Sequence, residues 1–387
     1  MAARRLRTSV APMVDVTDPC FLRLLRLVSP FGNHELWTEM VHANAFSRGG
    51  LHHQSAARLA QHIPVRELRD FASGVVVQIG ASAPDDAHAA VRALARLGVR
   101  RVNLNCGCPS RNVQMGSFGA VLMKSPDRAA AIVDAMRDAA SDAACEISVK
   151  CRIGVDDDES PEFLRRFIAA VTASASATGR SQPPPPLLPL CRSPRIVLHA
   201  RRAWLHGLSP KENRSVPALN HQRVRDMVRE FPHVSFVANG GIDSVDAVRR
   251  HLDVADAVMV GRKVREDPWF LARLDRDLYA VPAHRIPAAA DVLDQYVRFA
   301  DHMHDQYATR YTILARPLYA LFAGRRARAM RSHLGRAIAR AKNHPARIDD
   351  DDDDSTAAYY SAPFSELVLD AVHCAEREHR ELRLVPG

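Results

Sequence analysis

The segment at residues 103–110 reads Asn-Leu-Asn-Cys-Gly-Cys-Pro-Ser and lies at the end of a short apolar run. Pro109 fixes its own backbone angle and restricts Cys108 before it, so this thiol is expected on a rigid loop. At the carboxyl end of a barrel strand, such a thiol can donate a proton or act as a nucleophile. A disulfide, half of a zinc site and a loop cysteine without a role are the alternatives.

The spacing of the cysteines bears on two of these alternatives. Cys106 and Cys108 are poorly placed for a disulfide within one loop, and no second cysteine pair or nearby histidine pair completes a set of zinc ligands. The seven cysteines are scattered without framework spacing, which is typical of a reducing compartment. We therefore predict no metal site.

Polar groups and glycines stand at the ends of several other strand-like runs. They are Gln78, Lys150, His199, Asn239, Gly240, Gly241, Gly261 and Arg262. The glycines free backbone N–H groups to approach a phosphate, and the arginine adds charge. The lysine could hold negative charge on a reduced ring, while the glutamine amide and the histidine could pair with the ring edge. Together these groups describe a phosphate-tailed aromatic cofactor, and flavin mononucleotide (FMN) fits.

Each of these residues also has an interpretation without a cofactor. Gln78 could cap a strand, and Lys150 could pair with a loop carboxylate such as Asp156. His199 could be a satisfied buried imidazole, and residues 239–241 could form only a turn. Taken singly, these alternatives stay open. The recurrence of such groups at successive strand ends favours the cofactor site.

Eight short β-like runs alternate with helix-like stretches. The runs are Thr8–Met13, Glu35–Met40, Gly74–Ile79, Arg101–Asn105, Glu146–Cys151, Arg195–His199, Val234–Ala238 and Ala257–Val260. The stretches between them include Pro84–Leu97, Pro126–Ala140, Pro161–Ala173, His221–Phe231 and Ser244–Leu252. This alternation predicts an α/β fold with a parallel sheet, and eight units predict a closed (β/α)₈ TIM barrel. An open doubly wound sheet is the alternative, although it would more naturally show a Gly-x-Gly-x-x-Gly motif after its first strand.

The sequence becomes helical in pattern after the eighth run, which predicts two domains. The helical stretches are Ala288–Tyr307, Leu314–Ala323, Arg325–Lys342 and Ser365–Glu381. We expect a catalytic barrel over residues 1–280 and a small helical domain over 285–387. Four consecutive prolines predict an inserted surface loop at 174–194, and six consecutive aspartates predict a disordered insertion at 346–362 because like charges repel.

The chain carries a formal net charge of +9 despite its aspartate run. Arg325, Arg328, Arg331 and Arg336 fall near one face of a predicted helix, where guanidiniums suit phosphate contacts. A polyanion such as nucleic acid is therefore the expected partner, with an ordinary solvated helix face as the alternative.

Composition and apolar patterning indicate a soluble globular protein. The hydrophobic fraction is 47%, the charged fraction is 25%, and no apolar run is long enough to span a membrane. We expect a cytoplasmic monomer, while the basic residues at the start of the chain leave import into an organelle open.

Several short motifs occur together between about residues 9 and 338. They are Ala11-Pro12-Met13, Thr38-Glu39-Met40, Val77-Gln78-Ile79-Gly80, the segment 103–110, Gly116-Ser117-Phe118-Gly119-Ala120, Val149-Lys150-Cys151-Arg152-Ile153-Gly154, His199-Ala200-Arg201, Asn239-Gly240-Gly241 and Val260-Gly261-Arg262. In this combination the chain resembles the tRNA-dihydrouridine synthases. The run Trp-Leu-His-Gly-Leu-Ser-Pro-Lys-Glu-Asn-Arg at 204–214 resembles the subgroup that acts on uridines 20 and 20a of the tRNA D-loop.

The resemblance implies an FMN-bound barrel with a helical tRNA-binding domain, and NADPH as the reductant. In that family the flavin gives hydride to C6 of a flipped uridine, and a loop cysteine protonates C5. By motif position this cysteine is Cys108, and Asn105 would face the uracil. FMN contacts would fall on Pro12, Met13, Val14, Gln78, Lys150, His199, Asn239, Gly240, Gly241, Gly261 and Arg262. Candidates for tRNA contacts are Lys211, Arg214, Arg325 and Arg328.

Some positions depart from the family pattern. Cys106 stands where an apolar residue is usual, and we assign it no role, although an inhibitory disulfide under oxidation is conceivable. The Gly-rich connector of the helical domain is shortened to residues 324–326, and Pro317 stands near the place of a family histidine. These last departures concern the docking of tRNA rather than the chemistry.

Two other functions remain open from the sequence. One is an FMN-barrel oxidoreductase for a small pyrimidine, such as a dihydroorotate-type dehydrogenase, which leaves the basic helices unexplained. The other is a non-catalytic RNA-binding protein that keeps the fold, against which a flavin spectrum of the purified protein would count.

Overall fold

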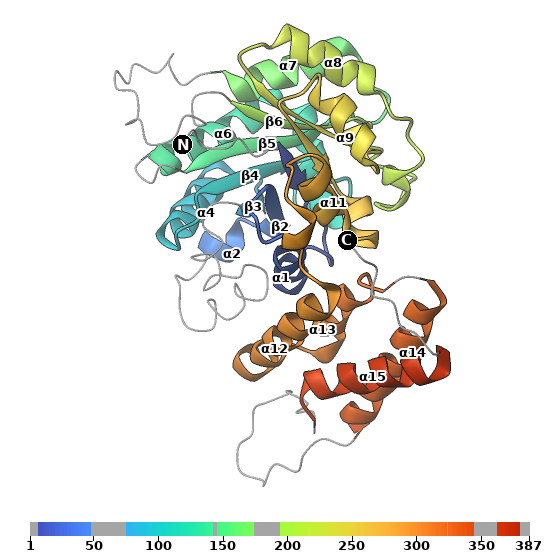
Figure 1. Ribbon diagram of the computed structural model, residues 1–387. Helices are drawn as coiled ribbons and strands as arrows, with labels where there is room; N and C mark the ends of the chain where they lie inside the picture. The colour runs from blue at the N-terminus through green and yellow to red at the C-terminus, as the bar shows by residue number, and fades with distance from the viewer. Residues whose placement is uncertain are drawn as a thin grey trace, which may run out of the picture. The chain divides into compact units, whose positions relative to one another are not determined.

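The computed structural model describes residues 7–47, 75–141, 145–173, 194–322, 324–343 and 362–379. The chain divides into two compact units, one of residues 1–17 with 32–262 and the other of residues 18–31 with 263–387 (Figure 1). The expected insertions at 174–194 and 346–362 lie outside the described residues, apart from Pro194 and Ala362. The domain limits expected at residues 280 and 285 stay a prediction.

A closed barrel of eight parallel strands forms the first unit. The strands are β1 (Thr8–Val10), β2 (His34–His42), β3 (Val75–Gly80), β4 (Arg101–Cys106), β5 (Glu146–Arg152), β6 (Arg195–His199), β7 (Ser235–Asn239) and β8 (Ala257–Val260). Each strand pairs with the next, and β8 pairs with β1. The (β/α)₈ barrel predicted from the alternating pattern is therefore confirmed, and the open doubly wound sheet is wrong.

The first strand is shorter than the sequence predicts. It ends at Val10 rather than Met13, although the Ala11 N–H still donates to the carbonyl of Val260 at 2.8 Å. Pro12 has no N–H with which to continue the ladder. The chain then turns, with the amides of Val16 and Thr17 donating to the carbonyl of Met13.

Helices follow the strands of the barrel, and local sequence signals define their starts. They are α2 (Asn44–Ser47), α4 (Pro84–Arg96), α5 (Arg111–Met115), α6 (Pro126–Ala140), α7 (Pro161–Thr172), α8 (His221–Glu230), α9 (Val245–Leu252) and α10 (Arg262–Glu266), with 3₁₀ turns at Gly119–Lys124 and Glu212–Arg214. Proline occupies the first turn of α4, α6 and α7, where its missing N–H has no intrahelical partner to lose. Ser160, Asn220 and Ser244 cap α7, α8 and α9 by accepting a backbone N–H.

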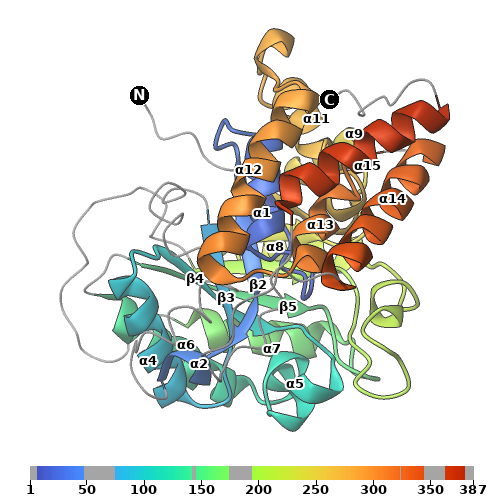
Figure 2. The ribbon, with the colours of Figure 1, turned by 90° about the horizontal axis from the view of Figure 1, so that it is seen from below.

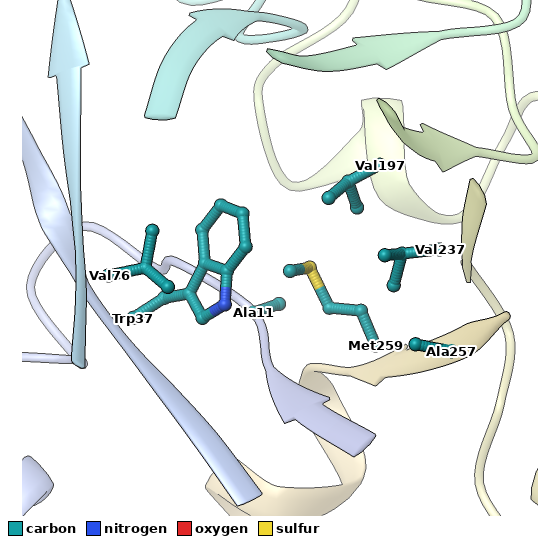
Figure 3. Packing of buried hydrophobic residues seen from close by; sticks show 7 residues of the cluster. All are labelled: Ala11, Trp37, Val76, Val197, Val237, Ala257 and Met259. Atoms are coloured by element: carbon teal, nitrogen blue, oxygen red, sulfur yellow. The ribbon is translucent and has the colours of Figure 1, made fainter. Parts of the chain in front are cut away.

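Apolar side chains fill the barrel. The central cluster consists of Ala11, Trp37, Val76, Val197, Val237, Ala257 and Met259 (Figure 3). Side chains alternate between the two faces of a strand, so a residue two positions further along points the same way. The interior positions after Val76, Val197 and Val237 are Gln78, His199 and Asn239, so the core gives way to polar groups at the carboxyl ends of the strands.

Helices make up the second unit. They are α1 (Pro19–Val28), α11 (Phe270–Asp277), α12 (Ala289–Tyr307), α13 (Tyr311–Leu318), α14 (Gly324–Asn343) and α15 (Phe364–His379), with a 3₁₀ turn at Ala283–Arg285. α14 buries Met330, Leu334 and Ile338 at helical spacing and packs beside α15 (Figure 2). The Ser29 hydroxyl after α1 donates to the Asp275 carboxylate of α11 at 2.5 Å. None of the described helices is long and apolar enough to cross a membrane.

Candidate active site

The backbone beyond β4 holds Cys108 in a fixed loop. The Asn105 amide oxygen accepts the N–H groups of Gly107 at 3.0 Å and Cys108 at 2.9 Å. The Cys108 carbonyl accepts the N–H of Ala120 at 2.9 Å, while its partly exposed thiol lies 3.6 Å from the Ser110 hydroxyl. The rigid thiol loop expected from Pro109 is thus built mainly by the side chain of Asn105.

A chain of side-chain amides connects this loop to the neighbouring strands. Asn105 Nδ2 donates to Gln78 Oε1 at 2.8 Å, and Gln78 Nε2 donates to Asn103 Oδ1 at 2.8 Å. Asn103 Nδ2 then donates to the Ser148 hydroxyl at 2.9 Å. Gln78 and Asn103 are buried, and a buried amide without partners would cost about 1–3 kcal/mol. The network therefore fixes the side chains across β3, β4 and β5, and it leaves Gln78 one N–H for a ligand.

Two further side chains anchor the cysteine loop from outside β4. Arg152 at the end of β5 is buried, donating Nε to the Gly107 carbonyl at 3.1 Å and Nη1 to the Asn213 carbonyl at 3.0 Å. Gln114 Nε2 donates to the carbonyls of Pro109 at 2.8 Å and Leu205 at 2.6 Å. The loop after β4 is thereby joined to the loop after β6.

Positive charge collects at the mouth of the barrel. Burial and the Arg152 guanidinium lower the pKa of Lys150 to about 8, although the Cys151 and Cys108 sulfurs oppose this shift. Burial also lowers the pKa of Arg152 to about 10, with Arg214 and Arg201 adding to the effect. These mutual shifts indicate that several cations lie close together here.

His199 is neutral in this setting. Burial, followed by the charges of Arg152, Lys150, Arg201 and Arg262, lowers its pKa well below 6.5. A neutral imidazole offers one donor and one acceptor rather than a charge. His199 therefore suits hydrogen bonding to a ring edge or a hydroxyl, as the sequence predicts.

Glycine is required beside this histidine. Gly240 has φ +109°, and a Cβ there would lie 2.5 Å from His199 Cδ2. Gly241 has φ +69°, also in the left-handed region. Asn239 Nδ2 donates to the Met259 carbonyl at 2.8 Å, which joins the ends of β7 and β8. The chain thus bends at Gly240 and Gly241 directly after β7, and the two glycines leave bare backbone at this strand end.

The residues at the mouth fit an anionic, phosphate-bearing cofactor. Arg201 is buried, and its Nε has no hydrogen-bond partner among the described residues. Arg262, which follows Gly261 at the end of β8, also lies near enough to lower the pKa of Arg201, after burial itself. A phosphate or an anionic ring would balance the positive charges that lie together here, and it could accept the N–H of Arg201 Nε.

The carboxylate named as an example of a partner for Lys150 is held elsewhere. Asp156 pairs with Lys124 instead, with 2.6 Å between Lys124 Nζ and Asp156 Oδ2. The other oxygen of Asp156, Oδ1, accepts the Leu205 N–H at 2.7 Å. No carboxylate acts among the charges that shift the pKa of Lys150. Among the described residues, Asp156 is therefore not the partner of Lys150.

The second thiol of the motif lies on the other face of β4. Cys106 is fully buried and is paired in register with Cys151 of β5, while Asn105 beside it faces the interior. Neither Cys106 nor Cys108 forms a disulfide. Burial and the neighbouring Cys151 raise the pKa of Cys106 well above 9. The structure therefore separates two thiols that the sequence leaves almost equivalent.

The loop after β6 is organised by one buried side chain. Asn213 Oδ1 accepts the Trp204 N–H at 2.7 Å, and Nδ2 donates to the Trp204 carbonyl at 2.9 Å. Arg202 lies over the Trp204 ring, 4.5 Å from its centroid. Lys211 and Arg214, the predicted tRNA contacts on either side of Asn213, are exposed.

The remaining predicted site residues differ in how far they are exposed. Pro12 and Met13 are partly buried after β1, and Val14 is exposed. Arg328 is exposed on α14 in the helical unit, while the side chain of Arg325 lies outside the described residues.

Sequence reasoning assigned no role to several residues that build this site. They are Asn103, Ser148, Arg152, Asn213 and Gln114. The alternation of Asn103 with Asn105 in β4 was a usable signal, since two amides on one face of a buried strand need partners. The contacts of Arg152 and Asn213 join segments far apart in sequence and had no such signal.

Comparison with known proteins identifies the family. The family described as dihydrouridine synthase (Dus) matches residues 9–177 and 193–349. A "tRNA-dihydrouridine(20/20a) synthase" of Xanthomonas axonopodis pv. citri is 38% identical over 313 residues, 80% of this chain and 84% of that protein. The protein of the same name from Escherichia coli K12 is 38% identical over 273 residues, 70% of each chain. Among solved structures, morphinone reductase matches 69% of this chain and 84% of its own, with a TM-score of 0.45 at 12% identity. This likeness is too low to indicate function. Because the family match and these relatives span most of the chain, it belongs to the dihydrouridine synthase family and is an enzyme.

Proposed function

We propose that this enzyme reduces uridine to 5,6-dihydrouridine at position 20 or 20a of the tRNA D-loop, using FMN and NADPH. The names of its relatives support the substrate. The observation that carries the proposal is the partly exposed Cys108 thiol, fixed on its loop beside the cluster of cations at the mouth. This arrangement combines an acid with a place for an anionic redox cofactor.

Cys108 is the proton donor in this proposal. A bound flavin, reduced by NADPH, would supply the hydride for C6 of the uracil. The Cys108 Sγ–H bond breaks as its proton goes to C5, and the sulfur keeps the electron pair. Arg152 and Lys150 lie close enough to this sulfur for its charge to oppose the lowering of their pKa values by burial.

The chain's other residues bind and orient the reactants. Lys150 and His199 would hold the flavin ring, and Gln78 would give it the one amide N–H that the network leaves over. The remaining cofactor contacts would be Pro12, Met13, Val14, Asn239, Gly240, Gly241, Gly261 and Arg262. Asn105 has one free N–H for the uracil, since its oxygen and its other N–H hold the loop and Gln78. A target uridine must leave its stack to reach this depth.

Basic side chains would receive the tRNA backbone. Lys211 and Arg214 flank the barrel mouth on the loop after β6, and Arg325 and Arg328 belong to α14. The net charge of +9 supports a polyanionic partner. A monomer in the cytoplasm, without a metal, remains our expectation.

The test uses the full chain, FMN, NADPH and a tRNA transcript that carries no modification. Mass spectrometry of the digested tRNA should show dihydrouridine at 20 or 20a, and Cys108→Ala should lower its rate about 10²–10⁴-fold while NADPH still bleaches the flavin. If the tRNA stays unmodified while free pyrimidines are turned over, the enzyme is instead an oxidoreductase of small pyrimidines. A protein that binds tRNA but no flavin would refute both activities.

A further inference from the structure

Exposed apolar side chains gather on the loops beyond the carboxyl ends of the barrel strands. Five large ones are exposed in the described part of the chain, and four of them follow β1, β4 or β6: Val14, Met115, Val216 and Leu219. The fifth, Leu369, lies on α15 of the helical unit. Single exposed apolar residues need no explanation, but four on loops that leave one end of a barrel indicate an interaction surface.

Met115 is the most exposed of this group, at 78%. It is the last residue of α5, seven positions after Cys108. A methionine left in water at this place gains nothing for the fold, so its exposure suggests that a partner covers it.

The backbone that carries Met115 is rigidly held. Gly116, which follows it, lies against the Phe118 ring, where a Cβ would come within 2.4 Å of Cε1. Phe118 is buried, and its other edge lies against Gly80 of β3. Gln114, which precedes Met115, is bonded to the carbonyls of Pro109 and Leu205. Met115 is therefore an exposed side chain on a backbone that both of its neighbours hold in place.

Charges on the same loops indicate RNA as the partner. Arg111 is exposed and stands four residues before Met115, so the two side chains are neighbours on the surface of α5. Lys211 and Arg214 are exposed on the loop to which Gln114 is bonded, and only Glu212 between them carries the opposite charge. A cation beside an apolar side chain matches a phosphate beside the face of an unstacked base.

We propose that Met115 packs against the tRNA base next to the reacting uridine and fills the place in the stack that this uridine leaves. The inference rests on the proposed function and adds a residue that promotes base flipping. Apolar wedges serve this purpose in other proteins that unstack nucleic acid bases. Met115 acts on the neighbouring base and not on the flavin or on the thiol.

The test compares Met115→Ala with Met115→Leu and with Leu369→Ala, an exposed apolar residue of the helical unit. A transcript with 2-aminopurine beside uridine 20 reports the stacking of that base by fluorescence. We expect Met115→Ala to lower kcat/KM for tRNA about five- to hundredfold and to change the fluorescence of the bound transcript. Met115→Leu and Leu369→Ala should behave as the wild type, and all three variants should keep the wild-type rate of flavin reduction by NADPH and the wild-type Tm.

The results that would overturn the inference are distinct from failure of the proposed function. Wild-type kcat/KM and fluorescence in Met115→Ala would refute it, as would an equal loss in Leu369→Ala. A change of sedimentation in Met115→Ala with unchanged tRNA turnover would show that the apolar group meets a second copy of the chain instead. If the wild-type enzyme forms no dihydrouridine, the proposed function fails, and an unchanged Kd of Met115→Ala for the tRNA transcript would then refute the inference as well.

Discussion

Cys106 is the buried last residue of β4, whereas Cys108 lies on the loop beyond it and is partly exposed. Asn105 points into the barrel and binds the loop that carries Cys108, so Cys106 must point outward, where it is buried beside Cys151. Direction along the strand, rather than the chemistry of the thiol, decides which of the two can meet a substrate.

The outward direction of Cys106 leads to the first prediction. Cys106→Val should leave the rate of dihydrouridine formation within about twofold of the wild type, because the new side chain fills the same buried space away from the mouth. Its matched partner is Cys108→Ala, which should lose most of the activity. Mass spectrometry of the tRNA measures both, and a tenfold loss in Cys106→Val would contradict the assignment.

Lys150 gives a prediction for pH. Its pKa is lowered by burial from 10.5 to about 8, so the folded protein binds fewer protons here than the unfolded chain. Stability therefore rises as the pH increases from about 8 to 10.5, and the charged lysine works against folding below about 8. An anionic ligand favours the charged form, so binding above about pH 8 must take up a proton.

FMN affinity should accordingly weaken as the pH rises through about 8, by at most about tenfold per pH unit. Titration of the flavin fluorescence between about pH 7 and pH 10 measures the Kd. Lys150→Met should bind more weakly and lose this dependence, whereas Lys211→Met, a lysine exposed on the loop after β6, should keep it. A pH dependence that survives in Lys150→Met would place the titrating group elsewhere.

At the scale of elements, the loop after β4 depends on how closely its backbone packs. Gly119 has φ +72°, and a Cβ there would lie 2.3 Å from Val113 Cγ1 and 2.7 Å from the Cys108 carbonyl oxygen. Gly207 has a similar φ of +79°, with nothing within 4 Å of its Cβ position. Substitution of Gly207 by alanine therefore introduces backbone strain alone, whereas the same substitution at Gly119 also displaces the cysteine loop.

Gly119→Ala should thus lower kcat at least about tenfold, since a displacement near 1 Å at a reacting group has effects of this size or larger. Gly207→Ala should keep kcat and lose only about 1 kcal/mol of stability through its strained φ. Urea unfolding and steady-state turnover of tRNA measure the two effects. Equal kcat values in the two variants would show that the position of the Cys108 loop does not limit the reaction.

At the scale of the whole molecule, the excess of positive charge should appear in the salt dependence of tRNA binding. Arg328 is exposed on α14, where the apolar side chains of the helix are turned inward against α15. Arg328→Ala should weaken tRNA binding at low salt and reduce the slope of log Kd against log salt by about 1. Arg298→Ala, which removes a cation already paired with Asp294 on α12, should change the slope less. Indistinguishable slopes for the two variants would exclude Arg328 as a phosphate contact.

Local sequence patterns determined much of this protein. All eight strands lie where the alternation of apolar runs predicts them, and two of them, β6 and β8, have the predicted bounds. Helix starts at Pro84, Pro126 and Pro161 follow from proline and its neighbours, because such signals act within one turn. The thiol motif and the polar strand ends were likewise readable, since strand order alone brings carboxyl ends to one edge.

Tertiary structure alone decided how these parts are joined. Closure of β8 onto β1, the bonds from Asn105 through Gln78 to Ser148, and the contact of Arg152 with Asn213 all join residues distant in sequence. The first helix after β1 belongs with α11 and α12 rather than with the barrel unit, which no local pattern signals. Residue types and short-range spacing carry the chemistry and the secondary structure, whereas register and packing select the partner of each buried polar group. The sequence by itself therefore determined the family and singled out the thiol that we propose as the proton donor, and only the folded chain decided which side chains hold that thiol in place.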